Sequence, residues 1–287
     1  MKYAFIESVH PKLAVSSLCR LLSVSRSGYY EWLCRPESER ARFDRHLLGE
    51  IERVHQAKRQ AYGAVKTWLE LNKQGIACGK HRVARLRKQA GIEARRKRRF
   101  RITVEHRERA PVAPNLIKQR FQAPQPDRVW VGDMTFIRTR EGFVHLAVLL
   151  DLYSRKVVGW AMSARPNLAV ALNALRMALI HRQPAPGLIH HTDQGQLYRA
   201  RQYLETLCNH GIDASMSAKG NAYDNAVAES FFSNLKNELV HHCDFRTRVE
   251  ARMAIFDYIE CFYNTQRLHQ TLSYISPVQF ETTNGVC

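Results

Sequence analysis

The chain of 287 residues fits two or three modules, and its 45% of apolar residues, without any apolar run of 18 residues, is typical of a soluble globular protein. Its formal net charge of +18 is unevenly spread: residues 1–120 hold 28 Lys and Arg against 11 Asp and Glu, a net of +17, and residues 121–287 hold 16 against 15, a net of +1. Such a one-sided excess favours a polyanionic partner over a generally basic surface, because each phosphate that is neutralised releases condensed counterions.

The N-terminal segment, residues 1–45, contains two short helical patterns. Leu13–Leu22 and Arg26–Leu33 flank a Ser-Val-Ser turn, which is the layout of a helix-turn-helix. Two amphipathic helices that merely pack together are an equally good interpretation, because such patterns are short and common.

A second helical block covers residues 46–105. Apolar residues recur at helical spacing in Leu47–Val54 and again around Val83 and Leu86, where Gly91-Ile92 marks a helix end. The order predicts a helical DNA-binding domain with a basic tail. Residues 106–126 contain four prolines and predict a linker.

The basic tail holds six cations in seven residues: Arg95, Arg96, Lys97, Arg98, Arg99 and Arg101. Such a run is often only a solvated segment. Its place directly after a helical module, in the most basic part of the chain, favours contact with nucleic acid phosphates.

From residue 127 to 240 the pattern changes to alternating strands and helices. Strands are predicted at Val129–Thr139, Phe143–Leu152, Lys156–Ser163, Gly187–His191 and Ile212–Ser217, and helices at Asn167–His181, Arg199–His210 and Asn225–Val240. Three strands joined by hairpin turns and then alternating helices and strands predict an α/β sheet with helices on its faces. A helix over Val249–Tyr263 and a tail containing Pro277 form a C-terminal extension, residues 241–287.

Three acidic residues lie where a free carboxylate is costly. Asp133 falls inside the first strand, Asp193 directly follows the apolar strand 187–191, and Glu229 lies among the apolar residues of the long helix. Carboxylates from two strand positions and one helix suit Mg²⁺ or Mn²⁺ rather than zinc. Each acid alone is more commonly solvated or paired with a cation, as Asp151, which we interpret as turn-forming, illustrates.

The spacing and the surrounding motifs resemble one family. Thirty-five residues separate Asp193 from Glu229, and the chain contains Trp130-Val-Gly-Asp-Met-Thr-Phe136, Ala147-Val-Leu-Leu-Asp-Leu-Tyr-Ser-Arg155, His191-Thr-Asp-Gln-Gly195, Gly220-Asn-Ala-Tyr-Asp-Asn-Ala-Val-Ala-Glu-Ser-Phe-Phe232 and Tyr263-Asn-Thr-Gln-Arg-Leu-His269. Over essentially its full length the chain resembles OrfB, the second product of a bacterial insertion-sequence family with two overlapping reading frames, within the retroviral-integrase-like transposases.

This resemblance implies a ribonuclease-H-like mixed sheet and a transposase that cleaves and joins DNA at insertion-sequence ends. It places Asp133, Asp193 and Glu229 on the family's catalytic acids, holding two Mg²⁺ or Mn²⁺ ions. Lys236, two helical turns after Glu229, would contact DNA phosphate, with a solvated lysine as the alternative. The implied partners are the terminal inverted repeats, target DNA, further copies of the chain in the synaptic complex, and the upstream OrfA product or an OrfAB fusion.

Neighbouring polar residues have structural alternatives. Asp224 or Asn225 is expected to cap the helix of Glu229, with DNA contact secondary for the segment from Asn221. His191 fits a hydrogen bond near the metal site and a satisfied core histidine equally well.

Seven scattered cysteines without a C-x-x-C pair, and an N-terminus without a signal-peptide pattern, favour a cytoplasmic protein without membrane contact. The resemblance to bacterial transposases implies association with the nucleoid. A nuclease that cuts without joining, and an inactive DNA-binding regulator, are the competing functions. The regulator is disfavoured because all three acids are present.

Overall fold

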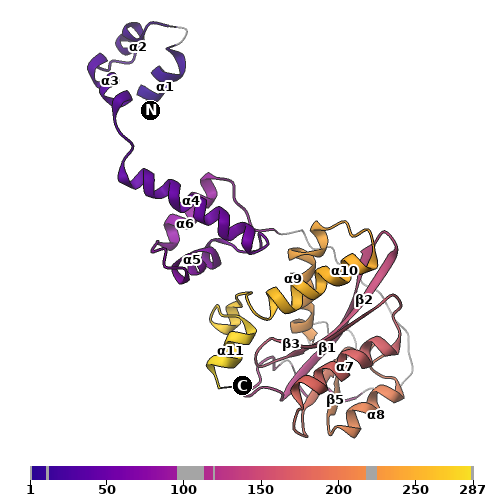
Figure 1. Cartoon of the computed structure of the whole chain (residues 1–287). Coiled ribbons are helices and arrows are strands. Elements are labelled where there is room, and N and C mark those ends of the chain that lie inside the picture. The colour runs from indigo at the N-terminus through magenta and orange to yellow at the C-terminus, as the bar shows by residue number, and fades with distance from the viewer. Residues whose placement is uncertain (1, 11–12, 96–112, 119, 218–224, 286–287) are drawn as a thin grey trace.

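The computed structural model describes residues 2–10, 13–95, 113–118, 120–217 and 225–285. Within these ranges no helix is long and apolar enough to cross a membrane. Helices α1–α6 fall into two N-terminal groups, and the single sheet that follows them is accompanied by helices α7–α11 (Figure 1).

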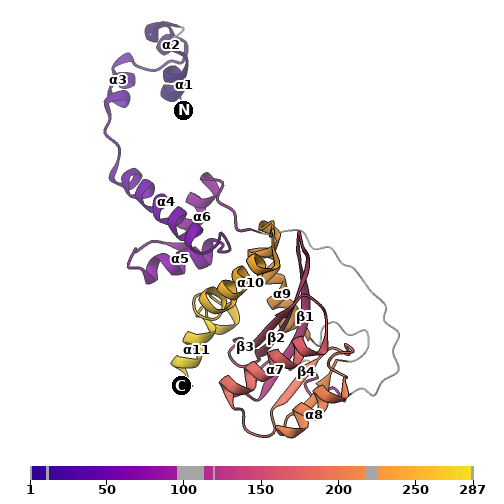
Figure 2. The ribbon, with the colours of Figure 1, turned by 45° about the vertical axis from the view of Figure 1, so that its right-hand side comes forward.

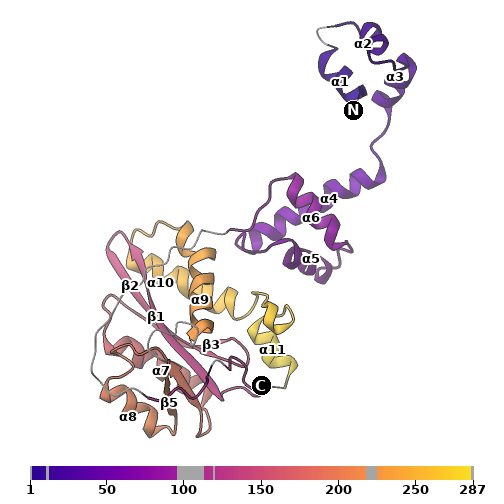
Figure 3. The ribbon, with the colours of Figure 1, turned by 180° about the vertical axis from the view of Figure 1, so that it is seen from behind.

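The first group comprises α1 (Lys2–Val9), α2 (Val15–Leu21) and α3 (Arg26–Cys34). They pack around Ile6, Leu18, Cys19 and Tyr29, all of which are buried. The Ser25 side chain accepts a hydrogen bond from the Gly28 amide and so caps α3. The two predicted helices are present, and α1, which lacks a strong apolar stripe, was not predicted. In each view this group stands apart from the rest of the chain (Figures 1 and 3).

The second group comprises α4 (Glu39–Ala57), α5 (Ala64–Lys73) and α6 (Lys80–Gln89). Their shared core is formed by Leu47, Ile51, Val54, Leu71, Val83 and Leu86. The predicted end of α6 is correct: Gly91 adopts φ +65° and the Ile92 amide donates to the Arg87 carbonyl. Helix α5 was not predicted, because Gly63 at its N-terminus provides no side-chain cap that would mark its start.

The sheet has five strands in the order β3-β2-β1-β4-β5. They are β1 (Val129–Thr139), β2 (Gly142–Asp151), β3 (Val157–Ser163), β4 (Ile189–Thr192) and β5 (Asp213–Met216). Strands β1, β2 and β3 pair antiparallel, whereas β4 runs parallel to both β1 and β5. The predicted α/β mixed sheet is therefore confirmed. The parallel pairs arise where a helix connects one strand to the next, before β4 and before β5.

Helices cover both faces of this sheet (Figures 1 and 2). Helices α7 (Leu168–Arg182) and α8 (Arg201–Asn209) cover one face, and α9 (Ala226–Glu238) and α10 (Arg248–Phe256) cover the other. Along β2, Leu146, Val148 and Leu150 belong to the core under α9, while Ala147 and Leu149 belong to the core under α7. This burial on both faces explains why β2 is a continuous apolar run instead of an alternating one.

The C-terminal extension differs from its prediction. The helix predicted over 249–263 is α-helical only to Phe256, and Asp257–Tyr263 continues as a π-helical segment. The predicted tail contains another helix, α11 (Pro277–Thr283), which the Ser276 side chain caps and which has proline at its first position. Short 3₁₀ turns occupy Val240–His242 and Gln270–Leu272.

Each edge strand of the sheet is hydrogen-bonded by a segment from elsewhere in the chain. At the β3 edge, the Asn264 side chain accepts from the Val157 amide (3.0 Å) and donates to the Val157 carbonyl (3.1 Å). At the β5 edge, the Met216 amide donates to the Pro114 carbonyl (3.4 Å), and the Leu116 amide donates to the Ser215 hydroxyl (2.9 Å). The described part of the expected linker therefore lies against the sheet.

A pair of glycine substitutions tests how closely α7 approaches the sheet. A Cβ on Gly159 of β3 would lie 2.3 Å from the Ala174 carbonyl oxygen, whereas one on Gly49 of α4 would meet nothing within 4 Å. We expect Gly159→Ala to lower the free energy of unfolding by about 1–3 kcal/mol. Gly49→Ala should raise it by about 0.5–1 kcal/mol. Thermal denaturation checks both, and a neutral Gly159→Ala would contradict this close packing.

Candidate active site

The parallel pairing of β1 and β4 brings two aspartates to one end of the sheet. Val131 of β1 is the register partner of His191 of β4. Asp133 lies two residues after Val131 in β1, and Asp193 lies two residues after His191, just past the end of β4. Continuing the register of the two strands therefore sets the two aspartates side by side. Gly132 allows the close approach, because a Cβ there would lie 2.7 Å from Cε1 of His190.

Local hydrogen bonds fix both aspartates. Oδ1 of Asp133 accepts from the Met134 amide at 2.7 Å, and Oδ1 of Asp193 accepts from the Gly195 amide at 3.0 Å. A side chain in place of Gly195 would meet the Asp193 carboxylate at 2.9 Å. The turn after β4 is therefore shaped around this carboxylate.

The electrostatics show that the acids are close to one another. The pKa of Asp133 is raised to about 8, first by burial, then by the charge of Asp193, and further by that of Glu229. The Met134 amide and Lys236 oppose this rise. Burial also raises the pKa of Asp193, against the hydrogen bond from Gly195. Carboxylates held together at this cost fit a site that binds cations.

Glu229 lies in the first turn of α9 and is exposed. Its charge acts on Asp133. Among the described residues, however, no three His, Cys, Asp or Glu side chains lie close enough together to enclose one ion. The structure therefore brings the two aspartates together and leaves Glu229 as a nearby third charge outside a closed ligand set.

Lys236 lies on the same face of α9 as Glu229 and is half-buried. Its Nζ is 5.8 Å from the centroid of the Phe136 ring. Burial lowers its pKa, and the charge of Asp133 raises it. The predicted phosphate-binding lysine therefore faces the same acidic site, and the alternative of a fully solvated side chain does not describe it.

The neighbouring polar residues take structural roles. His191 is buried, and its ring nitrogens lie 2.8 Å from the Ser215 hydroxyl and 3.2 Å from the Ser217 hydroxyl. Asp151 is buried and accepts from the amide and the hydroxyl of Ser154, in keeping with the turn-forming interpretation.

The expected cap of α9 is wrong for Asn225. Its side chain makes no capping hydrogen bond and donates instead to the Gly132 carbonyl of β1 at 3.4 Å. This contact ties the start of α9 to the strand that carries Asp133. Asn221, Tyr223 and Asp224 lie outside the described residues.

Of the basic run, only Arg95 is described. Its guanidinium donates to Oε1 of Gln60 at 2.8 Å and is partly buried, so it stabilises the α4–α6 group. Arg96, Lys97, Arg98, Arg99 and Arg101 lie outside the described residues.

Tyr198 is a residue of this region that sequence reasoning missed. It is buried against His190 and Tyr203, and its hydroxyl has no hydrogen-bond partner among the described residues. Burial raises its pKa, and Tyr203, Asp133 and Asp193 add to the rise. A single tyrosine after Asp193 has no periodicity or motif chemistry of its own, so only the fold reveals its place.

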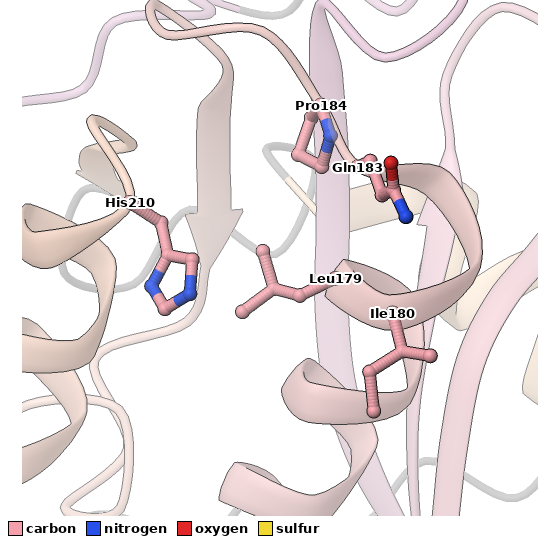
Figure 4. A pocket seen from close by; sticks show the side chains of 5 residues that line it. All are labelled: Leu179, Ile180, Gln183, Pro184 and His210. Atoms are coloured by element: carbon pink, nitrogen blue, oxygen red, sulfur yellow. The ribbon is translucent and has the colours of Figure 1, made fainter.

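A hollow elsewhere on the core carries no comparable chemistry. Leu179, Ile180, Gln183, Pro184 and His210 line a space of about 430 Å³ beside the end of α7 (Figure 4). No carboxylate lines it, and Nδ1 of His210 is already bonded to the Thr206 carbonyl at 2.8 Å. The acidic end of the sheet is therefore the better candidate for an active site.

Comparisons with protein families identify the domains of the chain. Residues 123–222 match the family described as integrase core domain, residues 229–284 match a second family of the same description, and residues 42–100 match an HTH-like domain. A mixed sheet of this topology with an integrase core match, preceded by a helical HTH-like unit, defines a transposase of the integrase-core, or DDE, class.

Full-length relatives identify the family. The chain is 40% identical over 286 residues to the transposase InsF for insertion sequence IS3A of Escherichia coli (strain K12), which covers 99% of both chains. It is 43% identical over 263 residues to an uncharacterized 31 kDa protein of insertion element IS600 from Shigella sonnei, covering 92% of this chain and 97% of that one. The chain belongs to the IS3 family of insertion-sequence transposases, as an InsF-type (OrfB) member.

Solved integrases are more distant. The simian T-cell lymphotropic virus intasome aligns with 80% of this chain and 73% of its own, at 15% identity and a TM-score of 0.47. The HTLV-2 integrase catalytic core in complex with magnesium aligns with 55% of this chain and 97% of its own, at 17% identity and a TM-score of 0.42.

Proposed function

We propose that Asp133, Asp193 and Glu229 are the catalytic acids of this transposase and hold two Mg²⁺ or Mn²⁺ ions. The observation that carries the proposal is the β1–β4 register, which sets Asp133 beside Asp193 with Glu229 near enough to raise the pKa of Asp133. Three carboxylates offer the hard oxygen donors that these ions prefer. The magnesium bound by the HTLV-2 integrase core is in keeping with this choice.

The proposed reaction is an in-line phosphoryl displacement. A water molecule or a DNA 3′-hydroxyl attacks the phosphorus, and the bond to the leaving 3′-oxygen breaks as the new P–O bond forms. Bound ions would stabilise the attacking and leaving oxygens. Asp133 and Asp193 orient the site, and Lys236 contacts a non-bridging phosphate oxygen of the DNA.

Glu229 completes this site by a movement of the first turn of α9. It starts outside a closed ligand set, and its exposed side chain is free of buried contacts that would hold it away. The Asn225 contact to Gly132 keeps the start of α9 beside β1, the strand that carries Asp133.

DNA binding is assigned to the helical modules and their basic tail. We propose modules at residues 1–45 and 46–105, a linker at 106–126, the catalytic core at 127–240 and the extension at 241–287. A groove between α4 and α6 is lined by Glu39, Arg40, Phe43, His81, Arg82 and Arg85. Asp44 holds Arg82 and Arg85 at 2.6 Å each, which fixes their direction beside this groove.

The basic tail should account for a large share of the salt dependence of binding. Replacing Lys97, Arg98 and Arg99 together with Gln removes three cations, and each lost phosphate contact should make the negative slope of log K against log salt shallower by about 0.9. Titrating labelled element ends at several salt concentrations measures this slope.

The matched control removes three exposed cations from the α7–α8 side of the core, Arg165, Arg176 and Arg201. Its slope should stay at the wild-type value. Equal slopes for the two triple variants would contradict the assignment of the tail to DNA phosphates.

The partners proposed for the complete reaction are the terminal inverted repeats, target DNA, at least one further copy of this chain and the upstream OrfA product or an OrfAB fusion, in the bacterial cytoplasm. Two element ends must be processed together, which is why more than one copy is needed. Incubating the protein and labelled ends with Mg²⁺ or Mn²⁺ tests the function. Joined products support a transposase, cleavage without joining supports a nuclease, and binding alone supports a regulator.

A further inference from the structure

One buried network joins the helical unit α4–α6 to the helix that carries Glu229. It begins at Arg87 of α6, which is buried and donates to the Tyr62 carbonyl and to the Thr67 hydroxyl, each at 3.0 Å. Helix α6 also bears Arg82 and Arg85, two of the three arginines that line the groove between α4 and α6. The position of Tyr62 is therefore fixed by the same helix that presents cations to DNA.

Tyr62 crosses from this unit into the core of the catalytic sheet. Only 1% of it is exposed, and it belongs to the apolar cluster beneath α9 and α10. Its hydroxyl donates to the Gln266 carbonyl at 3.2 Å and accepts from the Leu268 amide at 3.1 Å. One side chain thus holds the backbone on both sides of Arg267.

Arg59 reinforces this junction. Its guanidinium pairs with Asp257 and lies 5.8 Å and 5.3 Å from the ring centroids of Tyr258 and Phe262. The backbone at Arg59 adopts φ +56°, which turns the chain after α4 toward this contact. The junction is therefore built from specific contacts and not from a single hydroxyl.

Arg267 connects this junction to helix α9. Its Nε and Nη2 bind the two oxygens of Glu238 at 2.9 Å and 2.7 Å, and the Tyr258 hydroxyl donates to the same carboxylate at 2.8 Å. Both members of the ion pair are buried. Glu238 is the last residue of α9.

Glu238 and Glu229 lie nine residues apart, about 14 Å along the helix and half a turn around it. One therefore faces the buried network while the other faces the acidic site, in accord with their burial. A rotation of α9 about its axis that relaxed the Glu238 contacts would also displace Glu229.

We infer that Tyr62 and the Arg267–Glu238 pair are positioning residues through which the α4–α6 unit sets the orientation of α9 and hence the entry of Glu229 into the catalytic site. This inference rests on the proposed role of Glu229. It assigns the C-terminal extension the task of connecting end binding to completion of the site.

The test compares Tyr62→Phe and Glu238→Gln with the wild-type protein in strand transfer at saturating element ends. Each variant should raise the Mg²⁺ concentration for half-maximal activity by about tenfold, the low end of losses seen when residues that orient metal ligands are changed. High Mg²⁺ should restore most of the rate, and the affinity for element ends should be unchanged. The double variant should show no more than the larger single effect, because both changes interrupt one path.

Tyr29→Phe is the matched control, since Tyr29 is a buried tyrosine whose hydroxyl binds Glu7 within the α1–α3 group. It should leave the Mg²⁺ requirement unchanged. Where Glu238→Gln fails to fold, as breaking a buried ion pair can cause, Arg267→Lys replaces it.

Two results would overturn the inference: an unchanged Mg²⁺ requirement in Tyr62→Phe, or increases that multiply in the double variant. Asp193→Asn, run beside these variants, separates the two proposals. An active Asp193→Asn variant refutes the proposed site itself. If Asp193→Asn is inactive and Tyr62→Phe keeps the wild-type Mg²⁺ requirement, only the positioning role is refuted.

Discussion

We expect Asp193→Asn to lower strand transfer and end cleavage by at least about 10²–10³-fold, the loss that follows removal of one preorganised charge-stabilising group. The amide keeps the size of the side chain and the hydrogen bond from the Gly195 amide to its oxygen. It removes the negative charge that a cation requires. Binding of element ends should stay near the wild-type level, and gel-based cleavage and binding assays on the same preparation measure both.

Asp213→Asn is the control for this substitution. Asp213 is an exposed aspartate at the start of β5, the strand next to β4. It should retain wild-type cleavage. Near-normal strand transfer by Asp193→Asn would show that the acidic end of the sheet has been assigned wrongly.

Asp133→Asn should make the protein more stable in the absence of divalent ions while removing its activity. The pKa of Asp133 is raised to about 8, mainly by burial and by Asp193. Between the ordinary pKa of an aspartate, about 4, and about 8, the folded protein binds a proton that the unfolded chain lacks. The free energy of unfolding therefore falls as pH rises through this window. At pH 8 the variant should melt roughly 3 °C or more above the wild type.

Divalent ions should reverse the order of the two melting temperatures, so that the wild type becomes the more stable protein. Metal binding requires the deprotonated carboxylate, so Mg²⁺ should raise the melting temperature of the wild type more at pH 8 than at pH 6. Asp133→Asn should show little increase at either pH. Differential scanning fluorimetry with and without Mg²⁺ measures all four conditions, and an equal Mg²⁺ response in variant and wild type would contradict a metal site at Asp133.

Much of the sheet could be predicted because its strands are rich in apolar residues and are bounded by turn residues. The predicted limits of β1 are those observed, and the limits of the other strands differ by a few residues at most. The mixed direction of the strands could also be predicted, because helices are inserted before β4 and β5. Helix α1 could not be predicted, since it lacks a strong apolar stripe, and α5 could not, since Gly63 before it gives no capping signal.

The arrangement of the site was only partly accessible from sequence. Spacing and motif predicted which acids matter, but the register that sets Asp133 beside Asp193 is a property of the β1–β4 pairing. Asn225 illustrates the limit. A polar residue before a helix predicts a cap, yet its amide is drawn to the Gly132 carbonyl because α9 packs across β1. Arg267 belongs to the motif Tyr263–His269, but its pairing with Glu238, 29 residues away, could not be predicted from that motif.

The two segments that bind the edge strands of the sheet are synthesised at different stages of translation. The segment at Pro114–Leu116 is synthesised before any strand, so the β5 edge can pair with it as soon as β5 leaves the ribosome. Asn264 is made 107 residues after Val157, so the β3 edge lacks this partner while the intervening residues are synthesised. An open strand border invites pairing with other chains. Nascent chains that stall before residue 264 should therefore be the more prone to aggregate, whereas the finished chain has a hydrogen-bond partner at each edge strand.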